Sequence, residues 1–154
     1  MATTADATVH VDAPPERVYS LISDVTRMGD WSPECYRCEW VDGATGPEVG
    51  ARFKGHNKQG WMRWSTTAEV EVADPGREFT FSTRSGDKVA TRWCYRMAAA
   101  AGGTDVTESC EAVWTPLFVR IAEKTVLRNR PQQLRDGIRT TLGRVKAAAE
   151  AGGS

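Results

Sequence analysis

The chain has 154 residues, with twenty basic and twenty acidic side chains and a formal net charge of zero. A chain of this length can bury one hydrophobic core, so we expect a single domain over 1–154 with an ordered core over 6–150. The lack of a basic excess argues against a nucleic-acid partner. We find no membrane-spanning stretch and no signal peptide, which predicts a cytoplasmic protein with free thiols and without integral membrane association.

The first part of the chain predicts one strand and two short helices. Alternation of apolar and polar residues over 8–12 indicates a strand. Asp12 followed by two prolines is typical of a capped helix start. A second short helix is expected to begin at Ser23 or Asp24.

The middle of the chain predicts antiparallel strands. They are expected over 35–41, 51–57, 62–72, 77–83, 89–97 and 104–114. Turns rich in glycine, proline, asparagine and aspartate separate these segments. Connections of hairpin length favour antiparallel neighbours.

The last part of the chain predicts a long amphipathic helix. Four apolar side chains recur at steps of four, four and three on one helical face: Leu134, Ile138, Leu142 and Val145. Pro131 suits a first helical turn, so this helix is expected to begin at Asn129 or Arg130. A shorter helical segment is expected over 116–127. The apolar face needs a surface to cover, and a curved antiparallel sheet provides one, which predicts an α+β fold.

This element order resembles the START-like (SRPBCC) superfamily, and within it the polyketide cyclase/dehydrase and lipid-transport branch. The resemblance lies in Val11-Asp-Ala-Pro-Pro-Glu-Arg-Val-Tyr19, Trp31-Ser-Pro33, Gly50-Ala-Arg-Phe53, Trp64-Ser-Thr-Thr67, Glu71-Val-Ala-Asp-Pro-Gly-Arg-Glu-Phe79 and Thr104-Asp-Val-Thr-Glu-Ser109. It implies a helix-grip fold, in which a curved sheet closes over the C-terminal helix around an elongated cavity. Members carry lipids, polyketides, plant hormones or aromatic substrates, and some are catalysts, so the fold does not choose among these functions.

Strand parity predicts the cavity lining, because side chains of alternate residues point to the same face. The predicted ligand-binding residues are Trp31, Phe53, Asn57, Trp64, Phe81, Trp93, Tyr95, Glu108, Leu134 and Ile138. The aromatic side chains would form flat apolar walls, or they would simply pack the core. Asn57 would orient a polar ligand group, or satisfy the adjacent turn.

Glu108 shares the inner face of its predicted strand with Val106 and Cys110. A carboxyl buried there without a partner would have a raised pKa and could act as a general acid or base, with Tyr95 holding a developing enolate. The alternative is a structural carboxylate that pairs with Arg92, Arg96 or an arginine of the long helix, or that is hydrogen-bonded to Tyr95.

Cys35 and Cys38 have the spacing of a metal or redox motif. On a regular strand, positions three apart face opposite sides, so we expect their thiols to diverge and predict no metal site. His10 and His56 are both expected to point away from the interior, which leaves a base-assisted nucleophile poorly supported. The chain has no glycine-rich phosphate loop, and no cofactor is expected.

The leading hypothesis is a cytoplasmic protein that binds or transports a small hydrophobic molecule, namely a lipid, polyketide or aromatic metabolite. A second hypothesis is an enzyme of the cyclase, dehydrase or hydratase type that uses Glu108 as acid and base. A third is a protein-interaction module, which a large exposed apolar patch on the outer sheet face would support and which the polar outward side chains argue against. The sequence leaves a homodimer open.

Overall fold

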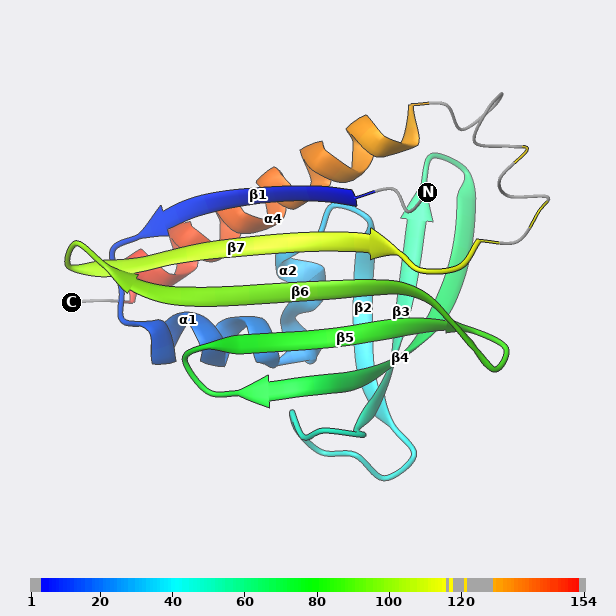
Figure 1. Cartoon of the computed structure of the whole chain (residues 1–154), viewed down its shortest axis with the longest axis horizontal. Helices are drawn as coiled ribbons and strands as arrows, with labels where there is room; N and C mark the ends of the chain where they lie inside the picture. Colours follow the sequence, from blue (N-terminus) through cyan, green and yellow to red (C-terminus); the bar gives the residue numbers. More distant parts are fainter. Residues whose placement is uncertain (1–3, 116, 118–120, 122–128, 153–154) are drawn as a thin grey trace.

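The structure is a computed structural model that describes residues 4–115, 117, 121 and 129–152. Seven strands in this part of the chain form one curved antiparallel sheet in the order β1-β7-β6-β5-β4-β3-β2 (Figure 1). The strands are β1 (Thr4–Val11), β2 (Cys35–Val41), β3 (Arg52–Gln59), β4 (Met62–Asp74), β5 (Glu78–Ser85), β6 (Lys88–Ala100) and β7 (Gly103–Ala112). The helices are α1 (Pro15–Ser23), a 3-10 turn η1 (Val25–Arg27), α2 (Met28–Trp31) and the long α4 (Arg130–Ala151).

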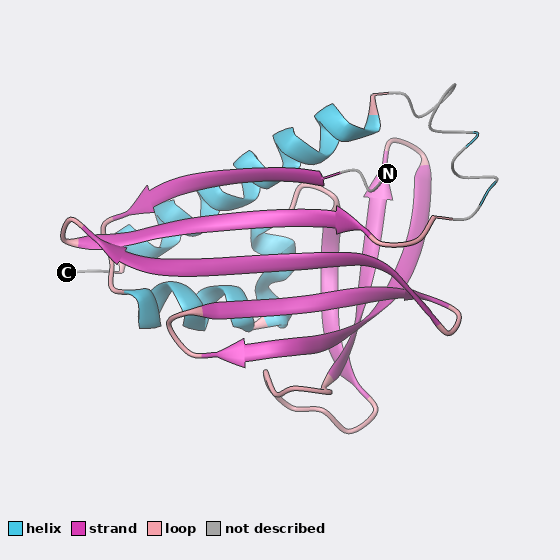
Figure 2. Ribbon diagram, viewed as in Figure 1, coloured by secondary structure: helices cyan, strands magenta, loops and turns pink. Residues whose placement is uncertain are grey.

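The sheet and the long helix form two layers, and Figure 2 shows α4 crossing one face of the sheet, with α1 and α2 beside it. Strands β2 and β3 run steeply across the direction of β1, β7, β6 and β5, so the sheet is strongly bent (Figure 1). This arrangement is the predicted α+β helix-grip fold.

The predicted strands are all present, with shifted ends. The strand expected over 8–12 extends over Thr4–Val11, and the strand expected over 104–114 ends at Ala112. The main helix begins at Arg130, which is one of its two predicted starts. The shorter helical segment expected over 116–127 lies almost wholly outside the described residues.

The short helices begin differently from one another. Asp24 caps η1 as predicted, because its Oδ1 accepts a hydrogen bond from the Thr26 N–H at 3.2 Å. The predicted capping of α1 by Asp12 is wrong: Pro14 is the N-cap residue and no side chain bonds the helix end. The Asp12 carboxylate instead lies 3.2 Å from the His10 ring.

The second half of α4 closes the hydrophobic core. Leu142, Val145 and Ala149 are almost fully buried, as are Val11 on β1 and Val18 on α1. The helix packs against β1 and α1 at this end. Burial of a valine or leucine side chain contributes roughly 1.5–3 kcal/mol, so this contact is the main attachment of the helix to the sheet.

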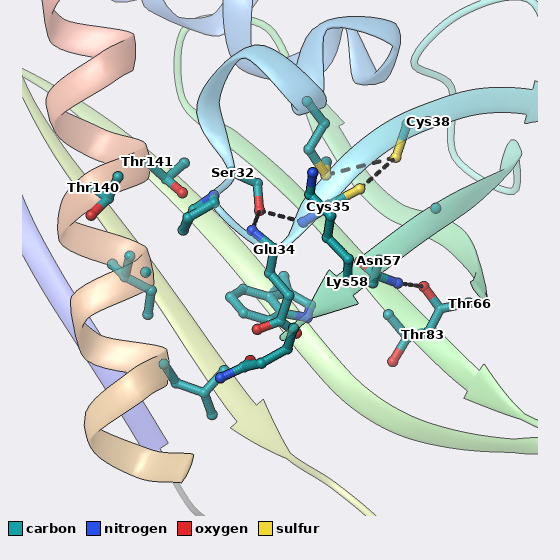
Figure 3. A pocket seen from close by; sticks show the side chains of 18 of the residues that line it. Ser32, Glu34, Cys35, Cys38, Asn57, Lys58, Thr66, Thr83, Thr140 and Thr141 are labelled. Carbon is teal, nitrogen blue, oxygen red and sulfur yellow. Dashed lines mark hydrogen bonds between the residues drawn. The ribbon is translucent and has the colours of Figure 1, made fainter. Parts of the chain in front are cut away.

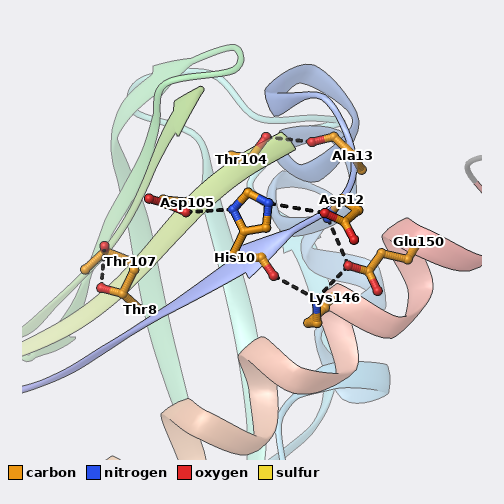
Figure 4. A network of polar contacts seen from close by, with 9 residues as sticks. All are labelled: Thr8, His10, Asp12, Ala13, Thr104, Asp105, Thr107, Lys146 and Glu150. Atoms are coloured by element: carbon orange, nitrogen blue, oxygen red, sulfur yellow. Dashed lines mark hydrogen bonds and ion pairs between the residues drawn. The ribbon is translucent and has the colours of Figure 1, made fainter. Parts of the chain in front are cut away.

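A polar network fastens the same end of α4 to the start of the chain (Figure 4). The Lys146 ammonium donates to the His10 carbonyl at 2.8 Å and pairs with Glu150 at 2.6 Å. Glu150 also accepts the backbone N–H of Asp12 at 2.9 Å. The turn after β1 is therefore tied to the last turns of the helix by hydrogen bonds as well as by apolar packing.

The outer face of the sheet is charged. Glu69 lies between Arg52 and Arg84, at 3.3 and 3.5 Å, and Arg92 bonds Glu71 at 2.9 Å. These side chains alternate along β3 to β6 with buried apolar ones, as strand parity predicts. The hypothesis of an interaction module requires an apolar patch here, and this surface carries ion pairs instead. No helix among the described residues is long and apolar enough to span a membrane.

His10 is expected to make stability depend on pH. Its Nδ1 lies 2.8 Å from Asp105, and this hydrogen bond raises the pKa of the imidazole above 6.5. The protonated ring therefore stabilises the fold below about pH 6.5, and this contribution is lost as pH rises through the raised pKa. We expect His10→Gln to be less stable than the parent at about pH 6, with the difference narrowing by about pH 8.5. Urea unfolding at both pH values measures it, and a difference independent of pH would contradict the assignment.

Candidate ligand cavity

A cavity of about 710 Å³ lies between the bent face of the sheet and the first half of α4. This volume is within the range of about 300–1,000 Å³ that is usual for small-molecule sites. Its wall comes from β2 to β7, from the segment before β2 and from α4, as the close view shows (Figure 3). The helix thus fills the core with its second half and leaves space beneath its first half.

One side of the cavity is apolar and aromatic. Phe53 and Phe81 pack edge to face, with ring centroids 5.0 Å apart, and Trp93 lies on the neighbouring strand β6. Leu134 and Ile138 close the opposite side from α4. These walls suit a ligand with a flat ring or an acyl chain.

Glu108 lies in this wall on β7 and is 2% exposed. Its Oε1 atom has no hydrogen-bond partner among the described residues. Burial raises the pKa of the carboxyl to about 8, while a hydrogen bond with Tyr95 acts weakly in the opposite direction. Glu108 is therefore mostly protonated at neutral pH, and its neutral form can both donate and accept a hydrogen bond.

The sequence left open whether Glu108 pairs with an arginine or is hydrogen-bonded to Tyr95, and its partner is Tyr95. Tyr95 lies directly opposite on β6 and bonds the carboxyl, and burial raises the pKa of this phenol well above its usual value. Neither of the two strand arginines pairs with Glu108, and Tyr95 is the side chain that bonds it. Arg92 pairs with Glu71, and Arg96 pairs with Glu78 at 3.3 Å, on the other face of the sheet.

Eight of the ten predicted site residues line the cavity: Phe53, Asn57, Phe81, Trp93, Tyr95, Glu108, Leu134 and Ile138. Trp31 lies instead in the core, where the Arg27 guanidinium covers its ring at 4.8 Å. Trp64 is half-buried on β4 outside the lining. Parity assigns a side chain to a face of the sheet but not to a position along the cavity, which explains the difference for Trp64. Trp31 ends the helix α2, where strand parity does not apply. A ligand-binding role for all ten stays a prediction.

The side chain of Asn57 forms a hydrogen bond with the neighbouring strand β4 and not with the hairpin turn. It lines the cavity, and its Nδ2 donates to the Thr66 hydroxyl on β4 at 3.4 Å. Thr66 and Thr83 add further hydroxyl groups to the same wall (Figure 3). The apolar cavity therefore contains a few polar groups that could orient a ligand.

Sequence reasoning missed an ion pair at the edge of the cavity. The Arg130 guanidinium donates two hydrogen bonds to Glu34, at 2.6 and 2.8 Å, and one to Gln59 at 2.9 Å. These contacts join the first turn of α4 to the segment before β2 and to the end of β3. The one sequence hint is that a basic residue in a first helical turn opposes the helix dipole and needs another partner.

The prediction that the thiols of Cys35 and Cys38 diverge is wrong. Their Sγ atoms lie 3.5 Å apart, both buried, in the cavity wall. A bulge after Cys35 inserts an extra residue into β2, so that Cys35 faces Asn57 and Cys38 faces Gly55. The bulge restores the two cysteines to the same face of the sheet. The hydrogen bond between them lowers the pKa of the Cys35 thiol and raises that of Cys38.

Comparison with known proteins establishes the family. The model of the family described as "Polyketide cyclase / dehydrase and lipid transport" matches residues 2–150, and the chain belongs to this family. No curated protein matches the chain. Family membership supports a ligand-binding or cyclase role without specifying which.

Solved structures agree with this assignment. A polyketide-cyclase-like protein of Corynebacterium glutamicum is 35% identical, with a TM-score of 0.59, over 97% of this chain and 90% of that one. A protein of Chromobacterium violaceum is 19% identical, with a TM-score of 0.70, over 96% and 98%. The di-domain ARO/CYC protein StfQ of the steffimycin biosynthetic pathway is 14% identical, with a TM-score of 0.76, and this chain covers 51% of it. The last two show likeness of fold alone.

Glu108 is expected to make the protein less stable as pH rises. Its pKa is raised from 4.5 to about 8 in the fold, so unfolding releases a proton between these pH values. The stability contributed by the neutral carboxyl is complete below about pH 4.5 and lost as pH rises through about 8, with a slope of up to about 1.4 kcal/mol per pH unit. We expect the neutral variant Glu108→Gln to remove this slope. Urea unfolding across this pH range measures it, and a variant that keeps the parent's slope would contradict a protonated Glu108.

Proposed function

We propose that the protein binds and carries a small hydrophobic molecule in the cavity between the sheet and α4. The observation that supports this most directly is a cavity of about 710 Å³ that has an aromatic and aliphatic wall and the buried carboxyl of Glu108. Lipids, polyketides and aromatic metabolites are the ligand classes we propose. A cytoplasmic location is part of the same proposal.

The lining suggests a ligand with a ring system and an oxygen atom. Phe53, Phe81 and Trp93 offer aromatic surfaces, and burial of about 300 Å² of apolar ligand surface would contribute roughly 7 kcal/mol before the costs of association. The neutral Glu108 carboxyl would donate a hydrogen bond to a ligand carbonyl or accept one from a hydroxyl.

Ligand entry is proposed to require opening near Arg130. Its contacts to Glu34 and Gln59 tie together three segments that surround the cavity. Movement of the β3–β4 hairpin would break the contact with Gln59.

A second candidate function is catalysis of a cyclisation or dehydration. The observation that favours it is the burial of Glu108 opposite Tyr95 in the cavity wall. This burial raises the pKa of the carboxyl to about 8, and a general acid or base works best when its pKa is near the operating pH. Glu108 would exchange a proton with the substrate, and the adjacent Tyr95 hydroxyl would stabilise an enolate. The likeness in fold to StfQ, a protein of polyketide biosynthesis, is compatible with this alternative.

Native mass spectrometry after gentle purification, followed by organic extraction, tests the binding proposal. We expect an apolar molecule to be recovered with the parent protein and also with Glu108→Gln, because most of its binding energy would come from apolar burial. An enzyme would retain binding in this variant but lose turnover of the recovered compound. Failure to recover or load any apolar ligand would contradict both functions.

Gly137 and Gly143 provide a matched test of where the ligand lies. Gly137 lines the cavity, and an added Cβ would lie 3.7 Å from Pro33, whereas Gly143 is exposed with open space around it. Each substitution by phenylalanine removes a glycine from a helix interior, where glycine costs about 0.5–1 kcal/mol. We expect Gly137→Phe to reduce binding of the uncharged dye N-phenyl-1-naphthylamine and of the recovered ligand at least tenfold, and Gly143→Phe to leave both unchanged. Equal binding by the two variants would place the ligand elsewhere.

A further inference from the structure

Three sulfur atoms gather in the wall of the cavity. Cys35 and Cys38 have Sγ atoms 3.5 Å apart, and the Cys38 Sγ lies 3.8 Å from the Met28 Sδ on α2. All three residues line the cavity, and the two cysteines lie together on the bulged start of β2 (Figure 3). The Ser32 hydroxyl accepts the backbone N–H of Cys35 at 2.9 Å, which holds the chain in place at this point.

We propose that Cys35, Cys38 and Met28 form a binding site for a soft monovalent metal ion of the copper(I) class. Two thiolates and a thioether are the ligand types that select copper(I). Each thiol that binds the ion would release its proton to solvent. This site does not depend on the identity of the hydrophobic ligand proposed above.

The spacing of the sulfur atoms suits a shared metal ion. Metal–sulfur bonds of about 2.3 Å, arranged in a trigonal plane, separate the sulfur atoms by about 4 Å. The two separations in the structure are 3.5 and 3.8 Å, so small side-chain rotations would suffice. Gly55 lies opposite, where a Cβ would come within 3.4 Å of the Cys38 Sγ and 3.5 Å of the Cys35 Sγ, so its lack of a side chain leaves the space beside them open.

A disulfide fits this backbone less well. Cys35 and Cys38 pair with Asn57 and Gly55, which are two residues apart on β3. The register therefore separates the two Cα atoms by about 6.7 Å, the rise of two residues in a strand. A disulfide usually needs about 4.4–6.8 Å, so the strand holds the pair at the upper limit. A metal ion bound by both sulfur atoms does not require the two Cα atoms to come closer together.

A divalent ion that prefers nitrogen and oxygen ligands is less suited to the site. Zinc in structural sites takes four ligands from cysteine, histidine and carboxylate. Across the described part of the chain, no three such side chains come together in a way that could hold a metal ion. Methionine supplies the third atom here, which favours the softer, lower-coordinate ion.

The test is a titration of reduced protein, without oxygen, with copper(I) supplied as its coloured bicinchoninate complex. We expect the parent to remove one copper(I) per chain from the complex. Cys35→Ser and Cys38→Ser should each weaken binding more than about 100-fold, since each removes a direct ligand. Met28→Leu conserves volume and should weaken it about tenfold without unfolding the protein. X-ray absorption of the loaded parent should show three sulfur ligands.

Cys94→Ser is the matched control, because Cys94 is a half-buried free thiol on β6 between the inward Trp93 and Tyr95. We expect it to bind copper(I) like the parent. The proposal fails if the parent takes up no copper(I), if Cys94→Ser loses binding as the other cysteine variants do, or if Met28→Leu keeps three sulfur ligands. Thermal unfolding of each variant shows whether a loss of copper(I) binding comes from misfolding. If a cysteine variant misfolds, the copper(I) binding of Met28→Leu decides whether the proposal holds.

Discussion

The structure depends on how α4 meets the sheet. Its apolar face must be buried, and the second half of the helix achieves this against β1 and α1, where Leu142 and Val145 are almost inaccessible to solvent. The sheet bends so that β2 and β3 run steeply across the other strands, and residues of both line the cavity together with the first half of the helix (Figure 1). Side chains do not fill the resulting space, and a cavity forms between Leu134 and Ile138 on one side and the sheet on the other. Packing and cavity are thus two consequences of one amphipathic helix on a bent surface.

Both ends of this helix are also held by polar contacts. Lys146 binds the end of β1 and Glu150 binds the turn that follows it, and Arg130 binds Glu34 and Gln59 at the opposite end. The contacts near the C-terminus reinforce an already buried interface. The contacts of Arg130 lie beside the cavity, where less apolar surface is buried, so they are the weaker attachment and the more natural place for opening.

Glu108 is the most costly residue in the cavity wall. A buried carboxylate without a positive partner is unfavourable, and the fold avoids this cost by keeping the group protonated. An apolar side chain would stabilise the fold more than a buried carboxyl if the position had only a structural role. The presence of Glu108 here is therefore consistent with a hydrogen bond from the neutral carboxyl to a ligand. The bulge that brings Cys35 and Cys38 together is a second local departure from regular structure in the same cavity, and such departures concentrate near functional sites.

The sequence by itself determined the elements and the faces of the strands. Periods of two and of 3.6 residues are local properties, so alternation placed Phe53, Phe81, Tyr95 and Glu108 on the inner side, and helical spacing placed Ile138 opposite them. Only the tertiary structure decided the rest. The Glu34–Arg130 pair joins residues 96 positions apart, and the meeting of Cys35 with Cys38 depends on one inserted residue that breaks the period. Neither long-range pairing nor a bulge leaves a periodic signal in the chain, and for the same reason periodicity could not tell how far along the strands the cavity extends.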